Sequence, residues 1–154
     1  MSPRAAWRLE GLGFSEVYVY AAGKADWGAA GLPVEGEVLR RPTIGAVARP
    51  DVPTCRAADR VTALRERLEG WDTCLVVNDA RVLLGRIRAD DLPADHAATA
   101  ESVMRPGPST FRPNVSVEEM LGYMREHDLR NAPVTHSDGT LVGLVLRSDL
   151  EKRR

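Results

Sequence analysis

Apolar residues recur every three or four positions in two stretches of the chain, a spacing that predicts helices with one buried face. The apolar positions are Val61, Leu64 and Leu68 in the first stretch and Val117, Met120, Leu121 and Met124 in the second. Ser116 followed by Glu119 is typical of a helix N-terminus, because the serine hydroxyl can accept a hydrogen bond from the N–H group of the glutamate. The second helix is therefore predicted to begin at Ser116.

Each predicted helix is followed by two short runs of β-branched and apolar residues, which predict a two-stranded hairpin. The runs read CLVV and RVLLGRI after the first helix, and NAPVT and TLVGLVL after the second. Turn residues separate the runs, Asn78-Asp79 in the first hairpin and Asp138-Gly139 in the second. After each hairpin an aspartate, Asp91 or Asp149, stands where a further helix would begin, and an acid is favourable beside the exposed N–H groups there.

These elements form two copies of one unit. Up to the first helix, residues of the first copy match residues 56 positions later, as Thr43 matches Thr99 and Arg49 matches Arg105. Beyond the helix the offset is 58, and two extra residues near REHDLRN in the second copy account for the change. The chain from about residue 43 to residue 150 is therefore predicted to fold as two similar halves.

The segment before the repeats has a pattern of its own. It predicts an apolar-faced helix, a turn at Gly11 and Gly13, a strand over EVYVY, and a short helix through Trp27 that stops at Gly31-Leu32-Pro33. The expected parts are thus an N-terminal fragment over 1–40 and two repeats over 43–95 and 99–154. The expected fold class is α/β (α+β).

Composition excludes several classes of protein. A net charge of −1 in 154 residues argues against a general nucleic-acid binder, which needs many basic side chains to neutralise phosphates. The longest apolar runs are far below the ~20 residues that span a bilayer, so no membrane segment is expected and we expect a cytoplasmic protein. Cys55 and Cys74 lack the close pairing of a zinc site and are expected to be buried free thiols, with no metal site and no catalytic residue predicted elsewhere.

The repeated order of opening loop, helix, hairpin and closing helix resembles the cystathionine-β-synthase (CBS) domain family. The closing stretches 85–92 and 143–150 carry the resemblance, since each has a glycine, strand residues, a variable triplet, an aspartate and a leucine. The resemblance implies a tandem pair of β-α-β-β-α repeats, also called a Bateman module. It further implies a regulatory homodimer without enzymatic activity, which requires no cofactor and senses AMP, ADP, ATP or S-adenosylmethionine.

The same resemblance implies ligand positions in two related clefts between the repeats. Asp91 and Asp149 would each hold a ribose, because a carboxylate offers two acceptor oxygens to two neighbouring hydroxyls. Arg88, three residues before Asp91, would contact a phosphate, whereas Leu146 at the matching place offers no hydrogen bond. The strand starts and opening loops would complete the clefts through Thr54, Thr73, Cys74 and Leu75 in one copy and Ser109, Thr110, Asn131, Ala132 and Pro133 in the other. An N-terminal helix cap, worth ~1 kcal/mol, is an equal explanation for either aspartate.

GFSEVYVYAAGKADWGAAGLPVEG is similar to the C-terminal portion of rhodanese (sulfurtransferase) domains. CRAADR, which begins at Cys55, also resembles a rhodanese active loop, but it lacks a glycine and carries Asp59, whose charge opposes thiolate formation. Cys55 also matches Phe111 in the second copy, so a buried apolar residue is expected there. Two alternatives to ligand sensing remain: a module that only binds another protein, and, more remotely, sulfur transfer through Cys55.

Overall fold

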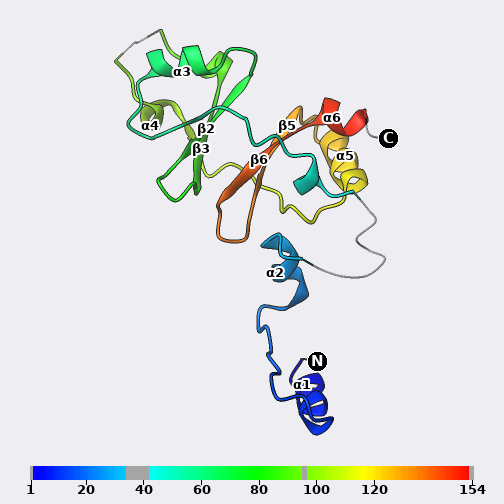
Figure 1. The fold of residues 1–154 in the computed structure, drawn as a ribbon. Helices are drawn as coiled ribbons and strands as arrows, with labels where there is room; N and C mark the ends of the chain where they lie inside the picture. Colours follow the sequence, from blue (N-terminus) through cyan, green and yellow to red (C-terminus); the bar gives the residue numbers. More distant parts are fainter. Residues whose placement is uncertain (1, 34–41, 95–96, 153–154) are drawn as a thin grey trace.

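The computed structural model describes residues 2–33, 42–94 and 97–152, and its elements follow the predicted order (Figure 1). The first repeat contains β1 Thr54–Cys55, α3 Val61–Arg67, β2 Thr73–Val77, β3 Leu83–Arg88 and the 3-10 turn η3 Ala89–Asp91. The second repeat contains α5 Val117–Glu126, β5 Asn131–Thr135, β6 Leu141–Leu146 and α6 Arg147–Glu151. The remaining elements are α1 Ser2–Gly11, α2 Gly23–Ala29, η2 Ile44–Ala46, α4 Ala100–Val103 and β4 Arg105–Pro106.

The predicted helix start and both hairpins are confirmed. The hydroxyl of Ser116 accepts a hydrogen bond of 3.2 Å from the backbone N–H of Glu119, so the serine caps α5. β2 pairs with β3 and β5 with β6, both antiparallel, and the register of each hairpin shifts near its turn. Gly139 has φ 85° in the second turn and its counterpart Arg81 has φ 59° in the first. The left-handed position of the first turn is therefore held by a residue that has a Cβ atom.

The two repeats exchange their opening segments. β4 opens the second repeat but pairs with β3 of the first, where Arg105 lies opposite Arg86. In the same way Arg49, which opens the first repeat, forms a bridge with Leu144 in β6 of the second. The β3 edge of the first hairpin and the β6 edge of the second are therefore covered by chain from the other half, which protects these edge strands.

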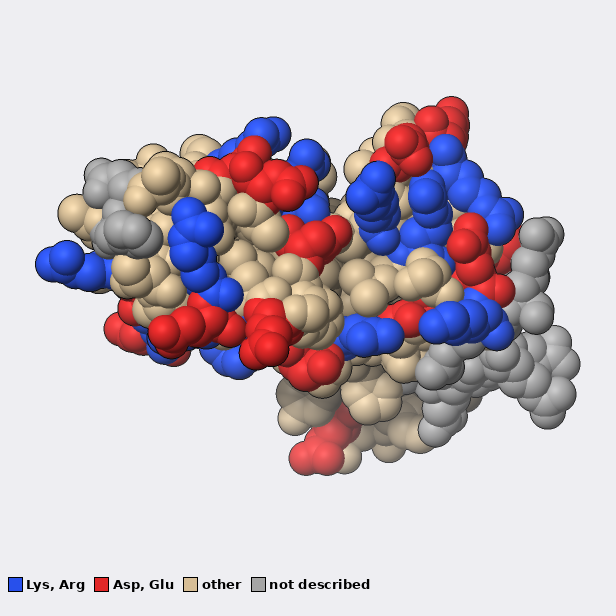
Figure 2. Space-filling model, turned by 90° about the horizontal axis from the view of Figure 1, so that it is seen from above, with Lys and Arg blue, Asp and Glu red and all other residues tan. Residues whose placement is uncertain are grey.

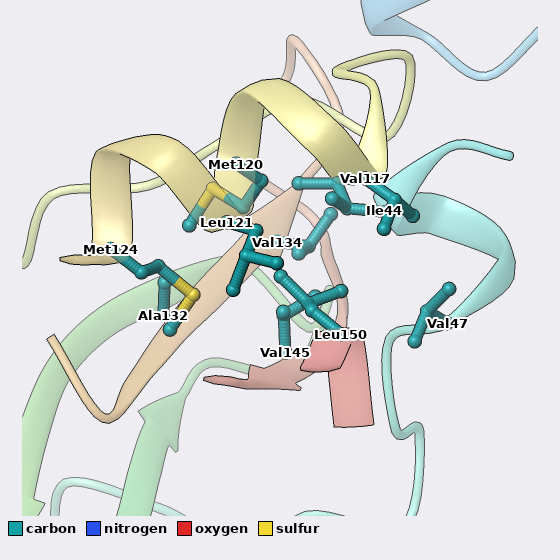
Figure 3. Close-up of a cluster of buried hydrophobic side chains, with 10 residues drawn as sticks. All are labelled: Ile44, Val47, Val117, Met120, Leu121, Met124, Ala132, Val134, Val145 and Leu150. Carbon is teal, nitrogen blue, oxygen red and sulfur yellow. The ribbon is translucent and has the colours of Figure 1, made fainter. Parts of the chain in front are cut away.

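The hydrophobic cores show the same exchange. Figure 3 shows the core of the second repeat, where α5 covers β5 and β6 and where Ile44 and Val47 of the opening segment pack against them. The core of the first repeat is likewise completed by Ala100 from α4. A third buried cluster joins the hairpins, with Leu75 of β2 and Leu144 of β6 both 0% exposed. Burial of apolar surface therefore locks the halves together.

Two details differ from the sequence-based expectation. The first repeat closes with the 3-10 turn η3 instead of an α-helix, because Pro93 two residues later has no N–H group to continue a helix. Residues 16–20 do not form the expected strand, since they have no hydrogen-bonded strand neighbour among the described residues. The expected helices α1 and α2 on either side of this segment are present.

The two N-terminal helices, α1 and α2, differ in their contact with the repeats. α2 lies against the second repeat, where a Cβ atom on Gly28 would be 3.0 Å from the Asn114 side chain. α1 lies apart from both repeats (Figure 1). Within the described ranges no helix has the length and apolar character of a membrane span. Residues 1, 34–40, 95 and 153–154 of the expected parts lie outside the described residues.

Candidate functional site

A polar network joins the two repeats where β2 and β5 begin. The Arg86 Nε donates to Thr73 Oγ1 at 2.9 Å, and the Arg86 Nη2 donates to Asn131 Oδ1 at 2.5 Å. The Asn131 amide in turn donates to the Asp72 carboxylate at 2.9 Å. Thr73 is fully buried and Asn131 is 4% exposed, so these hydrogen bonds satisfy polar groups that water does not reach. The network fixes the strand starts of both halves beside each other.

A cavity of about 310 Å³ opens along this seam, and we call it the basic cleft. Its wall from β3 and β4 carries Arg86, Arg88 and Arg105. The opposite wall belongs to the second repeat and consists of Pro108, Ser109, Phe111, Tyr123, His127, Leu129, Asn131, Ala132 and Pro133. The cleft thus has one cationic wall and one wall of apolar, aromatic and small polar residues.

The three arginines of the basic cleft differ in their partners. Arg86 is held by the polar network, and burial together with the nearby charge of Arg88 lowers its pKa. Arg105 is paired with Asp91 at 3.1 Å between Nη2 and Oδ2, an exposed contact that solvent screens. Arg88 is exposed, and its side chain has no hydrogen-bond or ion-pair partner among the described residues. The cationic wall is therefore only partly neutralised.

The aromatic side of the basic cleft is built by α5 and the segment before it. The rings of Phe111 and Tyr123 meet edge to face with centroids 5.2 Å apart, and the ring centroids of Tyr123 and His127 are 4.2 Å apart. Tyr123 is 41% exposed and so presents ring surface to a ligand. Such a wall suits the flat face of a heterocycle.

The matching positions in the other half carry different side chains. Leu144 and Leu146 stand 58 positions after Arg86 and Arg88; Leu144 is buried in the cluster that joins the hairpins, and Leu146 is half-buried against it. Asp149, which matches Asp91, accepts two hydrogen bonds from Arg49, at 2.6 Å from Nε and 3.0 Å from Nη2. Two leucines and a bidentate ion pair therefore stand where the basic cleft has its arginines.

Two other hollows lie on the same half. One of about 330 Å³ is lined by Val47, Arg49, Asp149 and Lys152. The other, of about 440 Å³, lies between residues 70–72 and the end of the second repeat, with Asp72 and Glu151 facing Arg130 and Arg147. Figure 2 shows the surface hollowed between the two lobes of the molecule, with both signs of charge around it. The larger hollow is mixed in charge and contains one predicted ligand residue, Asn131.

The structure brings together five of the predicted ligand residues and separates the others. Arg88, Ser109, Asn131, Ala132 and Pro133 line the basic cleft. Asp91 does not line the cleft, and its carboxylate forms an ion pair with Arg105, which does. Thr73, Cys74 and Leu75 are fully buried, the Thr54 carbonyl accepts from Arg67, and the Thr110 hydroxyl accepts from Arg112. None of these last five lines the basic cleft.

The capping explanation for Asp149 does not hold in the structure. Leu146 is the N-cap of α6, and the helix has no side-chain cap bond. Sequence reasoning also missed Arg86, Arg105 and the aromatic wall. The alternation in β3 could have revealed Arg86, because Arg86 and Arg88 lie on one face of the strand while Ile87 lies in the core.

The fold is a tandem pair of interlocked β-α-β-β-α units with clefts along their seam. Residues 100–153 match the family model of the CBS domain. The cytosolic domain of the Mg²⁺ channel MgtE in complex with ATP has a TM-score of 0.65 and 24% identity over 76% of this chain and 51% of that chain. This chain therefore spans about half of that domain.

Two further structures match over nearly their whole length. The CBS domains of a transcriptional regulator from Streptococcus pneumoniae have a TM-score of 0.65 and 22% identity, covering 71% of this chain and 97% of that chain. CBSX2 from Arabidopsis thaliana, solved in complex with AMP, has a TM-score of 0.65 and 21% identity, covering 72% and 94%. The chain has the fold of a CBS-domain pair, as the sequence predicted.

Proposed function

We propose that this protein is a regulatory module that senses an adenine nucleotide in the basic cleft and has no enzymatic activity of its own. The observation that carries the proposal is the convergence of Arg88, Ser109 and the start of β5 on one cavity whose walls come from both repeats. Guanidinium groups suit phosphate, and the aromatic wall suits a base. Similar folds have been solved with ATP and with AMP bound, which supports the class of ligand.

The mechanism that follows is a shift of population. A ligand that touches both walls stabilises the arrangement of the repeats that places the walls at the correct distance. The N-terminal segment and a second copy of the chain are the proposed readers of this arrangement. We therefore propose a homodimer, to be checked by light scattering during size-exclusion chromatography with and without nucleotide.

Isothermal titration with ATP, ADP, AMP and S-adenosylmethionine tests the proposal. Binding of at least one of them, weakened by Arg88→Leu, is the expected result. Arg60→Leu serves as the control, because Arg60 is an exposed arginine that does not line the basic cleft. No heat with any of the four ligands on folded protein would refute nucleotide sensing.

A second candidate function, recruitment of another protein, is favoured by the N-terminal segment. Most of the large exposed apolar side chains of the described residues lie there, namely Trp7, Leu9, Leu12, Phe14, Tyr18, Val19, Tyr20 and Leu32. Exposed apolar surface of this kind is typical of interaction sites. The proposed resemblance of this segment to the end of a rhodanese domain fits such a role. Deletion of residues 1–33 would abolish partner recruitment while leaving nucleotide binding unchanged.

Sulfur transfer through Cys55 has little structural support. Cys55 is 3% exposed in β1 and belongs, together with Cys74, to the buried core of the first repeat. A sulfur acceptor cannot approach a thiol buried in this way. The wild type and Cys55→Ser should therefore both transfer sulfur from thiosulfate to cyanide no faster than the uncatalysed reaction.

A further inference from the structure

We propose that the basic cleft selects its nucleotide by the length of the phosphate chain, favouring a triphosphate over a monophosphate, and that it is the one nucleotide site of each chain. This inference rests on the proposed function and specifies the ligand of that site. It excludes S-adenosylmethionine, a sulfonium cation, as the preferred ligand. The argument depends on how β3 and β4 place three guanidinium groups.

The backbone puts Arg86, Arg88 and Arg105 on the same face of adjacent strands. Arg86 and Arg88 are two residues apart in β3, so their side chains leave the same face of the sheet. Arg105 in β4 is the direct antiparallel partner of Arg86, which places its side chain on that face as well. All three residues line the basic cleft.

Like charges this close are unfavourable without an anion between them. Burial is the main cause of the lowered pKa of Arg86, and the charges of Arg88 and Arg105 lower it further. Cross-strand pairs of like charge destabilise a sheet. Asp91 neutralises Arg105 through an exposed contact, and Asp72 is bound to Asn131 in the network, so Arg88 is left without a counter-charge in the described chain.

A longer phosphate chain relieves more of this repulsion. One phosphate can reach one or two guanidinium groups, whereas a triphosphate presents oxygens along a length that can reach all three. Charge-assisted hydrogen bonds from arginine to phosphate are among the stronger ones in proteins. Affinity should therefore rise from AMP to ADP to ATP.

The other half of the pair lacks the arginines that would bind the phosphate chain. Leu144 and Leu146 stand at the positions of Arg86 and Arg88; Leu144 is buried between the hairpins, and Leu146 is half-buried against that cluster. Arg49, at the position of Arg105, is bound by both carboxylate oxygens of Asp149. The internal repeat has thus produced one cationic cleft and one counterpart without its arginines, where Leu146 lines a hollow of mixed charge. This asymmetry predicts one nucleotide per chain.

The experiment is calorimetric titration of the full chain with adenosine, AMP, ADP, ATP, S-adenosylmethionine and inorganic tripolyphosphate at two salt concentrations. Arg88→Leu gives position 88 the residue that the second repeat has at the matching place, and Arg60→Leu removes the same charge at an exposed site outside the described cavities. Circular dichroism checks that each variant is folded. Arg105→Gln is the second cleft variant.

We expect ATP to bind about tenfold or more tightly than AMP, since one additional charged hydrogen bond corresponds to a factor of this size. Arg88→Leu should remove most of that preference and Arg60→Leu none of it, with one ATP bound per chain. Higher salt should weaken the binding of ATP more than the binding of adenosine.

Three outcomes would overturn the inference while leaving the proposed function intact. These are AMP or S-adenosylmethionine binding as tightly as ATP, equal effects of Arg88→Leu and Arg60→Leu, and two ATP molecules per chain. Tripolyphosphate binding as tightly as ATP would mean that the base contributes nothing to recognition, which would contradict the proposed function as well. Absence of binding by every adenine compound would instead refute the proposed function itself.

Discussion

Arg49 and Asp149, 100 residues apart in the chain, form a bidentate ion pair with N–O distances of 2.6 and 3.0 Å. The pair joins the opening segment of the first repeat to the closing helix of the second. Its counterpart, Arg105 with Asp91, joins the opening of the second repeat to the close of the first. The duplicated sequence has therefore produced two crossed ion pairs, which connect each half to the other.

The two ion pairs should contribute unequally to stability. The Asp149 side chain is 16% exposed and that of Asp91 is 32% exposed, so water screens the Asp91 pair more strongly. Asp149→Asn should lower the urea midpoint of unfolding more than Asp91→Asn does. Double-mutant cycles with Arg49→Ala and Arg105→Ala measure each pairing. An equal loss for both aspartates would contradict the assigned difference in environment.

Gly143 should tolerate no side chain. A Cβ atom at this position would lie 2.5 Å from the backbone oxygen of Arg49, and the exchanged segment cannot move away without losing its bridge to Leu144. Gly143→Ala should destabilise the fold by about 1–3 kcal/mol, the usual cost of overpacking. Denaturant unfolding of Gly143→Ala measures this loss.

Gly122 is the control position, because alanine is expected to stabilise the protein there. It lies in α5 with no atom within 4 Å of its Cβ position. Gly122→Ala should stabilise the protein by about 0.5–1 kcal/mol, because alanine loses less backbone entropy in a helix. Similar effects of the two alanine variants would argue against close approach of the exchanged segment at Gly143.

Replacement of Arg81 by glycine should stabilise the protein. Its φ of 59° is left-handed, which costs a residue with a Cβ atom about 1 kcal/mol, and the matching turn of the second hairpin has Gly139 there. Arg81→Gly should raise the thermal midpoint. Arg81→Ala, which removes the side chain but keeps Cβ, should not. A loss of stability in the glycine variant would contradict this prediction. It would show that the added conformational entropy of the unfolded chain outweighs the relief of backbone strain in the turn.

Asp59 should make stability depend on acid pH. The backbone N–H of Arg56 and the guanidinium of Arg67, at 2.6 Å, lower the pKa of this carboxyl group in the folded state. Because the folded pKa lies below the unfolded one, the stabilisation is present above the unfolded value of about 4 and is lost as pH falls through the folded pKa. The difference in unfolding free energy between the wild type and Asp59→Asn should therefore shrink between pH 6 and pH 3. A difference that does not change with pH would contradict this role.

The sequence by itself determined the local elements and their duplication. Helical spacing and the Ser116 cap placed α5, and the alternation around the turns placed both hairpins, because these signals depend on residues close together in the chain. The pairing of residues 56 and 58 positions apart identified the two repeats. It also showed that Leu146 at the place of Arg88 makes the halves chemically unlike.

Only the tertiary structure decided which half completes which core and which cleft stays open. Ile44 packs with the second repeat and Ala100 with the first, an exchange between segments that are distant in sequence. The basic cleft depends on Arg105 lying opposite Arg86, a register between β3 and β4 that no local pattern encodes. The reason is physical: hydrogen-bond spacing and apolar periodicity are local properties, whereas cavity shape and the distance between charges depend on how all the elements pack together.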